Sequence, residues 1–174
     1  MRARLACLMF LAPACVPAEQ EADGKVPGDV VGTFVASGRI TSDECGAELL
    51  GAENPWEFPV KLSRQGRVLY WLNGREAIVG DLGADELEFE FATRIETVLT
   101  PARGASPGCT IERLDQLKGA LRREGEAARG FRAALSYTYS ARFDAECVEF
   151  IGIPGGVASL PCELEYDLVA VSID

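Results

Sequence analysis

The sequence predicts an all-β, disulfide-stapled fold: an antiparallel up-and-down barrel or strongly curved meander of about eight strands, with at most one short helix. Three observations predict it. Apolar and charged residues alternate with a period of two in several segments, turn-forming residues separate the segments, and their spacing is roughly ten to twelve residues. Such a meander closes into a barrel or folds into a sandwich. We favour the barrel because closure removes exposed strand edges.

The first half of the chain contains five expected strands. The clearest is the last, where Leu87, Phe89 and Phe91 alternate with glutamates. The dipeptide Asn73-Gly74 separates two apolar runs and predicts a tight hairpin turn with positive φ at both residues. The five segments are residues 30–40, 58–62, 68–72, 76–82 and 87–91.

The second half contains two clear strands, at residues 131–139 and 162–168, and one ambiguous segment at 110–123. The ambiguous segment has a helical apolar stripe, but it also alternates around Leu117 and Leu121. Gly119 inside a helix would cost about 1 kcal/mol, and a strand would pair with residues 131–139 across a polar turn. We therefore favour a strand over a helix here.

The N-terminal residues have the pattern of an export signal. Two arginines, Arg2 and Arg4, precede an apolar run, and small residues from Ala12 to Ala14 provide a cleavage site before Cys15. The run is shorter than the roughly twenty apolar residues that a membrane-spanning helix needs. We expect residues 1–14 to be removed, residues 15–26 to form a flexible tether, and residues 27–174 to form one domain.

Cys15 at this position resembles the lipidated cysteine of bacterial lipoproteins, whose signals end in a short apolar-small-small-Cys box. Ala12 stands where that family usually has leucine, and ordinary cleavage without acylation is the alternative. The resemblance implies an acylated Cys15 and a membrane partner through this N-terminal lipid anchor. It also implies a place in the bacterial cell envelope, at the outer membrane or in the periplasm.

The predicted domain contains four cysteines, and an even number in an oxidising compartment predicts two disulfides. Three connectivities are open. We favour Cys45 with Cys109 and Cys147 with Cys162, because the second bridge would close the Gly/Pro-rich connection at residues 153–156. Zinc sites use closely spaced cysteine pairs with histidine, and the chain has neither, so we expect no metal.

The strand count, together with Gly32-Thr33-Phe34 in the first expected strand, resembles lipocalin-type barrels. The tryptophan usual in their first strand is absent here. This resemblance implies barrel architecture and transfers no residue role.

Charge and composition exclude several classes of function. Removal of Arg2 and Arg4 from the 17 basic side chains leaves 15 against 27 acidic ones, a formal charge of −12. Nucleic acid is therefore not an expected partner. The absence of histidine excludes Ser-His-Asp and Cys-His catalysis and histidine-bound zinc. We expect no cofactor.

Acidic residues are the remaining candidates for catalysis. Glycoside hydrolysis needs two carboxyl groups at a defined separation, and three groups of acidic residues qualify by sequence. Turns and solvated strand faces explain the same residues without chemistry. The groups are Asp43-Glu44, Asp85-Glu86 and the alternating Glu163, Glu165 and Asp167.

Trp71 follows Tyr70 directly, so in a strand one of the two side chains must face outward. An outward Trp71 is a possible contact patch, and a tryptophan that caps the end of the barrel is the more common alternative.

We expect a non-enzymatic exported envelope lipoprotein that acts as a binding or structural module, with a protein or small-molecule partner that the residues do not identify. A lipocalin-like carrier of a small apolar ligand is the alternative. Large side chains at nearly every inward position argue against the carrier, since they predict a filled interior. An acid-based hydrolase is the third hypothesis.

Overall fold

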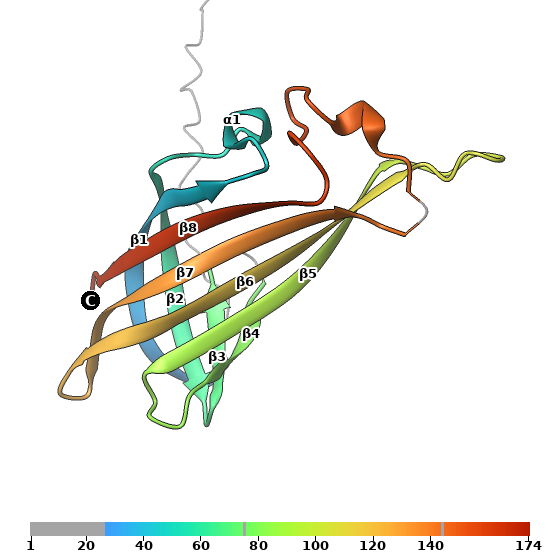
Figure 1. Ribbon diagram of the computed structural model, residues 1–174. Helices are drawn as coiled ribbons and strands as arrows, with labels where there is room; N and C mark the ends of the chain where they lie inside the picture. Colours follow the sequence, from blue (N-terminus) through green and yellow to red (C-terminus); the bar gives the residue numbers. More distant parts are fainter. Residues whose placement is uncertain (1–26, 75, 144) are drawn as a thin grey trace, which may run out of the picture.

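The computed structural model describes residues 27–74, 76–143 and 145–174, and these form one closed antiparallel barrel (Figure 1). Each strand pairs with the next along the chain, and the last pairs with the first, so the barrel prediction is confirmed. The predicted signal, Cys15 and the tether lie outside the described residues. The strands are β1 (Asp29–Asp43), β2 (Trp56–Gln65), β3 (Val68–Leu72), β4 (Ile78–Leu82), β5 (Glu88–Thr100), β6 (Cys109–Glu124), β7 (Ala127–Ala141) and β8 (Cys162–Ser172).

Helical structure in the described residues is limited to two single turns, α1 (Ala47–Leu50) and the 3-10 turn η1 (Val148–Phe150). The side-chain oxygens of Asp43 accept hydrogen bonds from the backbone N–H groups of Gly46 and Ala47 at the start of α1. None of the helical turns within the described ranges is long and apolar enough to cross a membrane.

The ambiguous segment 110–123 is a strand, as favoured, and Gly119 shows why. A Cβ atom built on Gly119 would lie 2.6 Å from the Phe89 ring and 2.6 Å from the Ala133 Cβ atom. Only glycine therefore allows β5 and β7 to hold these side chains against β6 at this level.

The two ends of the barrel differ in their connections. At one end, which we call the short-loop end, the strands are joined by residues 66–67, 83–87 and 125–126. At the other, the long-loop end, the connections are residues 44–55, 73–77, 101–108 and 142–161. Figure 1 shows α1 and the loop that contains η1 together at this long-loop end.

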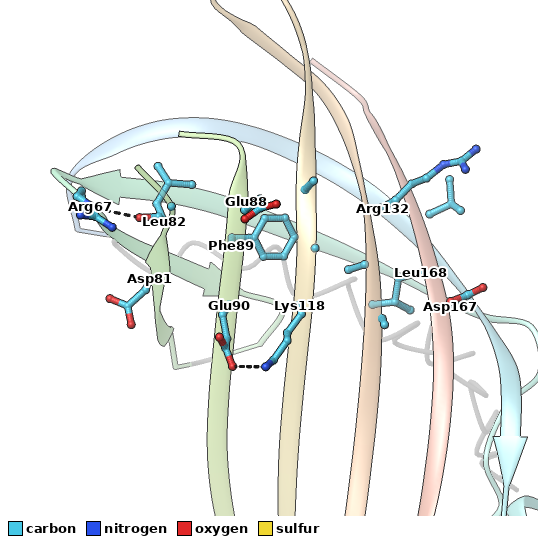
Figure 2. Close-up of a pocket in the computed structure, with 16 residues that line it drawn as sticks. Arg67, Asp81, Leu82, Glu88, Phe89, Glu90, Lys118, Arg132, Asp167 and Leu168 are labelled. Atoms are coloured by element: carbon cyan, nitrogen blue, oxygen red, sulfur yellow. Dashed lines mark hydrogen bonds and ion pairs between the residues drawn. The ribbon is translucent and has the colours of Figure 1, made fainter. Parts of the chain in front are cut away.

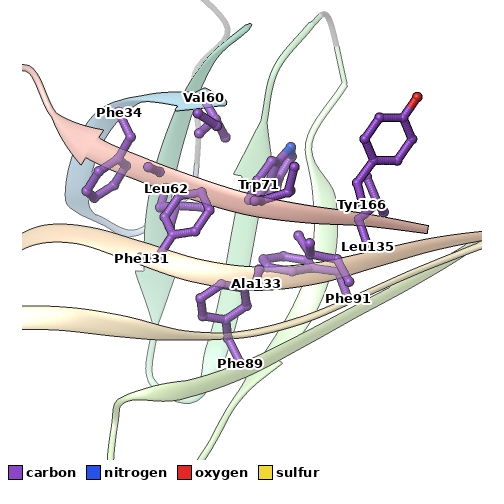
Figure 3. Close-up of a cluster of buried hydrophobic side chains, with 14 of the residues drawn as sticks. Phe34, Val60, Leu62, Trp71, Phe89, Phe91, Phe131, Ala133, Leu135 and Tyr166 are labelled. Atoms are coloured by element: carbon purple, nitrogen blue, oxygen red, sulfur yellow. The ribbon is translucent and has the colours of Figure 1, made fainter. Parts of the chain in front are cut away.

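The interior of the short-loop half is filled by interlocking aromatic rings. The Phe131 ring centroid lies 5.5 Å from Phe34, 5.7 Å from Phe89 and 5.5 Å from Trp71 (Figure 3). Phe34 and Phe131 are completely buried. The contacts with Phe34 and Phe89 are edge-to-face and the contact with Trp71 is tilted, and such contacts favour a single arrangement of the rings. This half matches the expectation of a filled interior.

Of the two neighbours Tyr70 and Trp71, Trp71 is the one that faces inward. Its side chain is only 4% exposed and belongs to the ring cluster, while Tyr70 is the partly exposed neighbour. Leu69 and Trp71 share the inner face because side chains two apart in a strand point the same way. Trp71 therefore forms no surface contact patch.

The predicted tight turn at Asn73-Gly74 is also wrong. Trp71 pairs with Ile78, so the connection covers residues 73–77, and neither Asn73 nor Gly74 has a positive φ. A two-residue turn would have placed Glu76 opposite Trp71 on the inner face. The observed register places the apolar, half-buried Ile78 there instead, and burial of one face fixes strand register.

The four cysteines form two disulfides, but the favoured pairing is wrong. Cys45 is bonded to Cys162, and Cys109 is bonded to Cys147, with Cα–Cα distances of 5.0 and 4.9 Å. Strand pairing explains the first bond, because Asp43 at the end of β1 lies opposite Leu164 near the start of β8. The second forms because the backbone N–H of Glu146 bonds the carbonyl of Gly108, which brings Cys147 beside β6.

Each end of the segment 147–162 is thus bonded to a different part of the barrel. We call this segment the strap. Its backbone is also held by hydrogen bonds from Gly155 N–H to the Leu49 carbonyl and from Ala158 N–H to the Cys45 carbonyl, both 2.7 Å.

Disulfide mapping tests this arrangement. Digestion without reduction is expected to yield peptides that link Cys45 to Cys162 and Cys109 to Cys147. Replacing Cys109 and Cys147 with serine is expected to lower the free energy of unfolding by about 4 kcal/mol, because the unfolded chain regains loop freedom. Chemical denaturation measures this loss. A peptide that links Cys147 to Cys162 would contradict the structure.

Candidate ligand site in the long-loop half

A cavity of about 540 Å³ lies inside the barrel toward the long-loop end. Inward-facing residues of strands from β2 to β8 line it, and its volume falls within the range of small-molecule sites. Most of the lining is aromatic or aliphatic, with five polar side chains. The lining residues are Trp56, Phe58, Trp71, Asn73, Glu76, Ile78, Phe91, Thr93, Ile95, Arg113, Asp115, Leu117, Leu135, Tyr137 and Leu168.

Aromatic rings form one side of the cavity. Trp56 and Phe58 on β2 have ring centroids 4.2 Å apart, and the ring centroids of Phe58 and Trp71 are 6.1 Å apart. Phe91 follows at 5.8 Å from Trp71. The expectation of a filled interior therefore fails for this half, because the large side chains pack against one another and line the space.

The main polar feature of the cavity is an ion pair within one strand. Arg113 and Asp115 lie two residues apart on the inner face of β6, with Nε–Oδ1 2.6 Å and Nη2–Oδ2 2.8 Å. Their side chains are 34% and 15% exposed. The guanidinium carbon of Arg113 also lies 4.8 Å from the Tyr137 ring centroid. Two parallel hydrogen bonds are the geometry that makes a half-buried ion pair tolerable.

Burial determines how these groups ionise. Desolvation raises the pKa of Asp115, although the hydrogen bond and charge of Arg113 oppose the rise. Desolvation is the largest single influence on Arg113 and would lower its pKa, but the hydrogen bond and charge of Asp115, together with smaller contributions from Tyr139, outweigh it and the pKa is raised. Burial, followed by the nearby charge of Asp115, raises the pKa of Tyr137 well above its ordinary value. The phenol therefore stays neutral at physiological pH, beside an ion pair with no net charge.

A smaller pocket of about 150 Å³ lies beneath the strap. Phe150 and Val157 of the strap face barrel residues there, and Val157 is 2% exposed. Ile95 and Arg113 line both this pocket and the main cavity, so the two are neighbours. The strap thus covers the space beside the ion pair.

The outer face of β4 to β8 bears a larger but shallower groove of about 760 Å³ (Figure 2). Exposed charged side chains line it, including Lys118, whose Nζ lies 3.0 Å from a Glu90 carboxylate oxygen. Both side chains are at least half exposed, and water and salt weaken such surface pairs. The interior cavity is the better candidate site because it is concave and mainly apolar.

The acidic groups singled out by sequence lie elsewhere. Asp85 accepts the backbone N–H groups of Leu87 and Glu88 in the β4–β5 turn, and these bonds lower its pKa. The hydrogen bond from Arg64 lowers the pKa of Glu86. Both effects stabilise the ionised carboxylates, which is the opposite of what a general acid needs.

The other two groups also lie outside the cavity. Glu163, Glu165 and Asp167 alternate on β8 with its buried residues, and Asp43 binds the backbone before α1. In the part of the chain that the structure describes, Asp, Glu and Cys side chains form no cluster of three or more able to hold a metal ion.

Sequence analysis missed Arg113, Asp115 and Tyr137. The signal was present, because Ile111, Arg113, Asp115 and Leu117 share one face when residues 110–123 are read as a strand. Two charged residues among the inward positions of a strand indicate an interior polar site.

The ionisation of Asp115 provides a test of the ion pair. Arg113→Met is expected to raise the pKa of Asp115 further, because desolvation remains while the opposing charge is lost. A raised pKa favours the folded state only while the carboxyl is protonated. The variant should therefore lose stability relative to the original as pH rises through the folded-state pKa of Asp115.

Carboxyl carbon NMR shifts measured against pH report this pKa directly. Arg94→Met removes an exposed arginine of β5 that pairs with Glu112, and it is the matched control. An Asp115 pKa that stays the same or falls in Arg113→Met would contradict the pairing.

Comparison of this chain with protein-family models, characterised proteins and solved structures gives no match. The site is therefore interpreted from its own geometry, and the likeness to lipocalins stops at the closed eight-strand architecture.

Proposed function

We propose that this protein is an exported, non-enzymatic barrel that binds a small, mainly apolar molecule in its long-loop half. The supporting observation is the cavity of about 540 Å³, with aromatic and aliphatic walls and one internally neutralised ion pair. Eight-stranded barrels have room inside for packed side chains or for one small ligand. Here the short-loop half has the packed side chains, and the long-loop half has the space.

A ligand explains the cavity better than a purely structural role does. Protein interiors are close-packed, with few voids larger than a water molecule. A cavity with apolar walls and a few placed polar groups is the usual form of a small-molecule site. The hydrolase hypothesis is less favoured, because Arg113 holds the Asp115 carboxylate through two hydrogen bonds and Glu76 is exposed.

Binding of a neutral apolar fluorophore, N-phenyl-1-naphthylamine, tests this proposal. The chain has two tryptophans, and both Trp56 and Trp71 line the cavity, so energy transfer from tryptophan to the probe reports on this site. We expect saturable binding to the mature protein. Thr93→Phe places a ring in the cavity and should weaken binding about tenfold or more.

Ala92→Phe is the matched control, since Ala92 is exposed on the outer face of the same strand and does not line the cavity. It should leave the affinity unchanged. The proposal fails if the original protein shows no saturable binding, or if both variants weaken it equally.

The export proposal depends on residues 1–14 as a signal and on an acylated Cys15. The two disulfides support an oxidising compartment. Pro27, whose carbonyl accepts a 2.7 Å hydrogen bond from Ser63, lies at the short-loop end. A lipid anchor at Cys15 would thus be connected to the barrel at the short-loop end, the end opposite the connections that surround the cavity.

The intact mass of the exported protein tests this proposal. We expect the mass of the chain from Cys15 onward plus several acyl chains, because stable anchoring needs more than one chain. The mass of an unmodified chain that begins at Cys15 would exclude the anchor while leaving the ligand proposal intact.

A further inference from the structure

Charge is distributed unequally between the two ends of the barrel. Within the described residues, the connections at the long-loop end bear six exposed glutamates and two arginines. The short-loop half bears both signs of charge, since Arg64 pairs with Glu86 and Arg129 pairs with Glu124. The six glutamates are Glu44, Glu48, Glu53, Glu76, Glu146 and Glu149.

The two arginines of these connections do little to offset this charge at the cavity. Arg103 lies in the connection between β5 and β6, which projects beyond the barrel in Figure 1. Arg142 pairs with Glu96 at 3.4 Å. We call the point where exposed Glu76 lines the cavity the entrance; the described residues of the connections at this end have a net negative charge, which attracts cations and repels anions.

The cavity interior favours the same sign of charge. Trp56 and Phe58 are half-buried at the start of β2 and stack on each other, and the faces of aromatic rings attract cations. Glu76 both lines the cavity and is exposed to solvent. An anionic ligand would instead have to compete with Asp115 for Arg113, whose guanidinium already makes two hydrogen bonds to that carboxylate.

Building on the proposed function, we propose that the ligand is a cationic amphiphile. Its apolar body lies deep in the cavity among Leu117, Leu135 and Leu168, and its amine or quaternary ammonium group lies at the entrance beside Glu76. The Arg113–Asp115 pair stays intact, because the charged head group remains at the entrance. The shared chemistry is an ammonium group on an apolar body, whatever the shape of that body.

Three ligands of equal chain length test the inference: decyltrimethylammonium, 1-decanol and decanoate, each titrated into the mature protein with tryptophan fluorescence as the readout. We expect the ammonium compound to bind about tenfold more tightly than the alcohol, and decanoate more weakly than either. Added salt should weaken binding of the ammonium compound and leave the alcohol unaffected.

Two variants locate the head group and the tail. Glu76→Gln should weaken binding of the ammonium compound several-fold and leave binding of the alcohol unchanged. Glu126→Gln, in the exposed β6–β7 turn, should change the affinity for neither ligand. Thr93→Phe should weaken both ligands. Ammonium binding that persists in Thr93→Phe would place it outside the cavity and overturn the inference.

The remaining outcomes separate this inference from the proposed function. Equal affinities for the ammonium compound and the alcohol, or tightest binding of decanoate, would overturn the charge preference while the cavity proposal stands. Failure of all three ligands, together with the neutral fluorophore, would overturn both.

Discussion

The packing of Phe131 against Phe34, Phe89 and Trp71 is the interaction on which the rest of this structure depends. It brings side chains from opposite parts of the barrel wall into contact and fills the short-loop half. Beyond this level the wall becomes unequal, since β3 and β4 have 5 residues each while β5, β6 and β7 have 13, 16 and 15. In the closed strand order, the long β6 and β7 lie across from β2 and β3, which have only 10 and 5 residues, so the interior there is left open as a cavity.

The strap compensates for this inequality. It packs Phe150 and Val157 against the long strands and is bonded at one end to β6 and at the other to the residues that follow β1. Tying this long, mostly irregular segment to two separate parts of the barrel limits its freedom in the unfolded chain and in the folded one. The same segment covers the pocket next to Arg113, so the strap contributes both to the stability of the barrel and to the shape of the candidate site.

Much of this fold could be predicted from the alternation of apolar and polar residues with a period of two, because this pattern indicates both where strands form and which face of each strand is buried. The disulfide partners could not, since strands far apart in sequence meet only when β8 closes against β1. The inward orientation of Trp71 was equally hidden, because β3 is apolar on both faces. The role of Arg113 and Asp115 could not be predicted either, because it depends on residues 110–123 forming a strand whose inner face lines a cavity.

The most direct measurement is to locate a bound apolar molecule by NMR, with nuclear Overhauser contacts from neutral N-phenyl-1-naphthylamine to leucine methyl groups. The account predicts contacts to Leu117, Leu135 and Leu168, which line the cavity, and none to the fully buried Leu62 and Leu69. Contacts confined to Leu62 and Leu69, or a molecule bound only on the outer face beside Lys118, would contradict a barrel that is filled in one half and open to a ligand in the other.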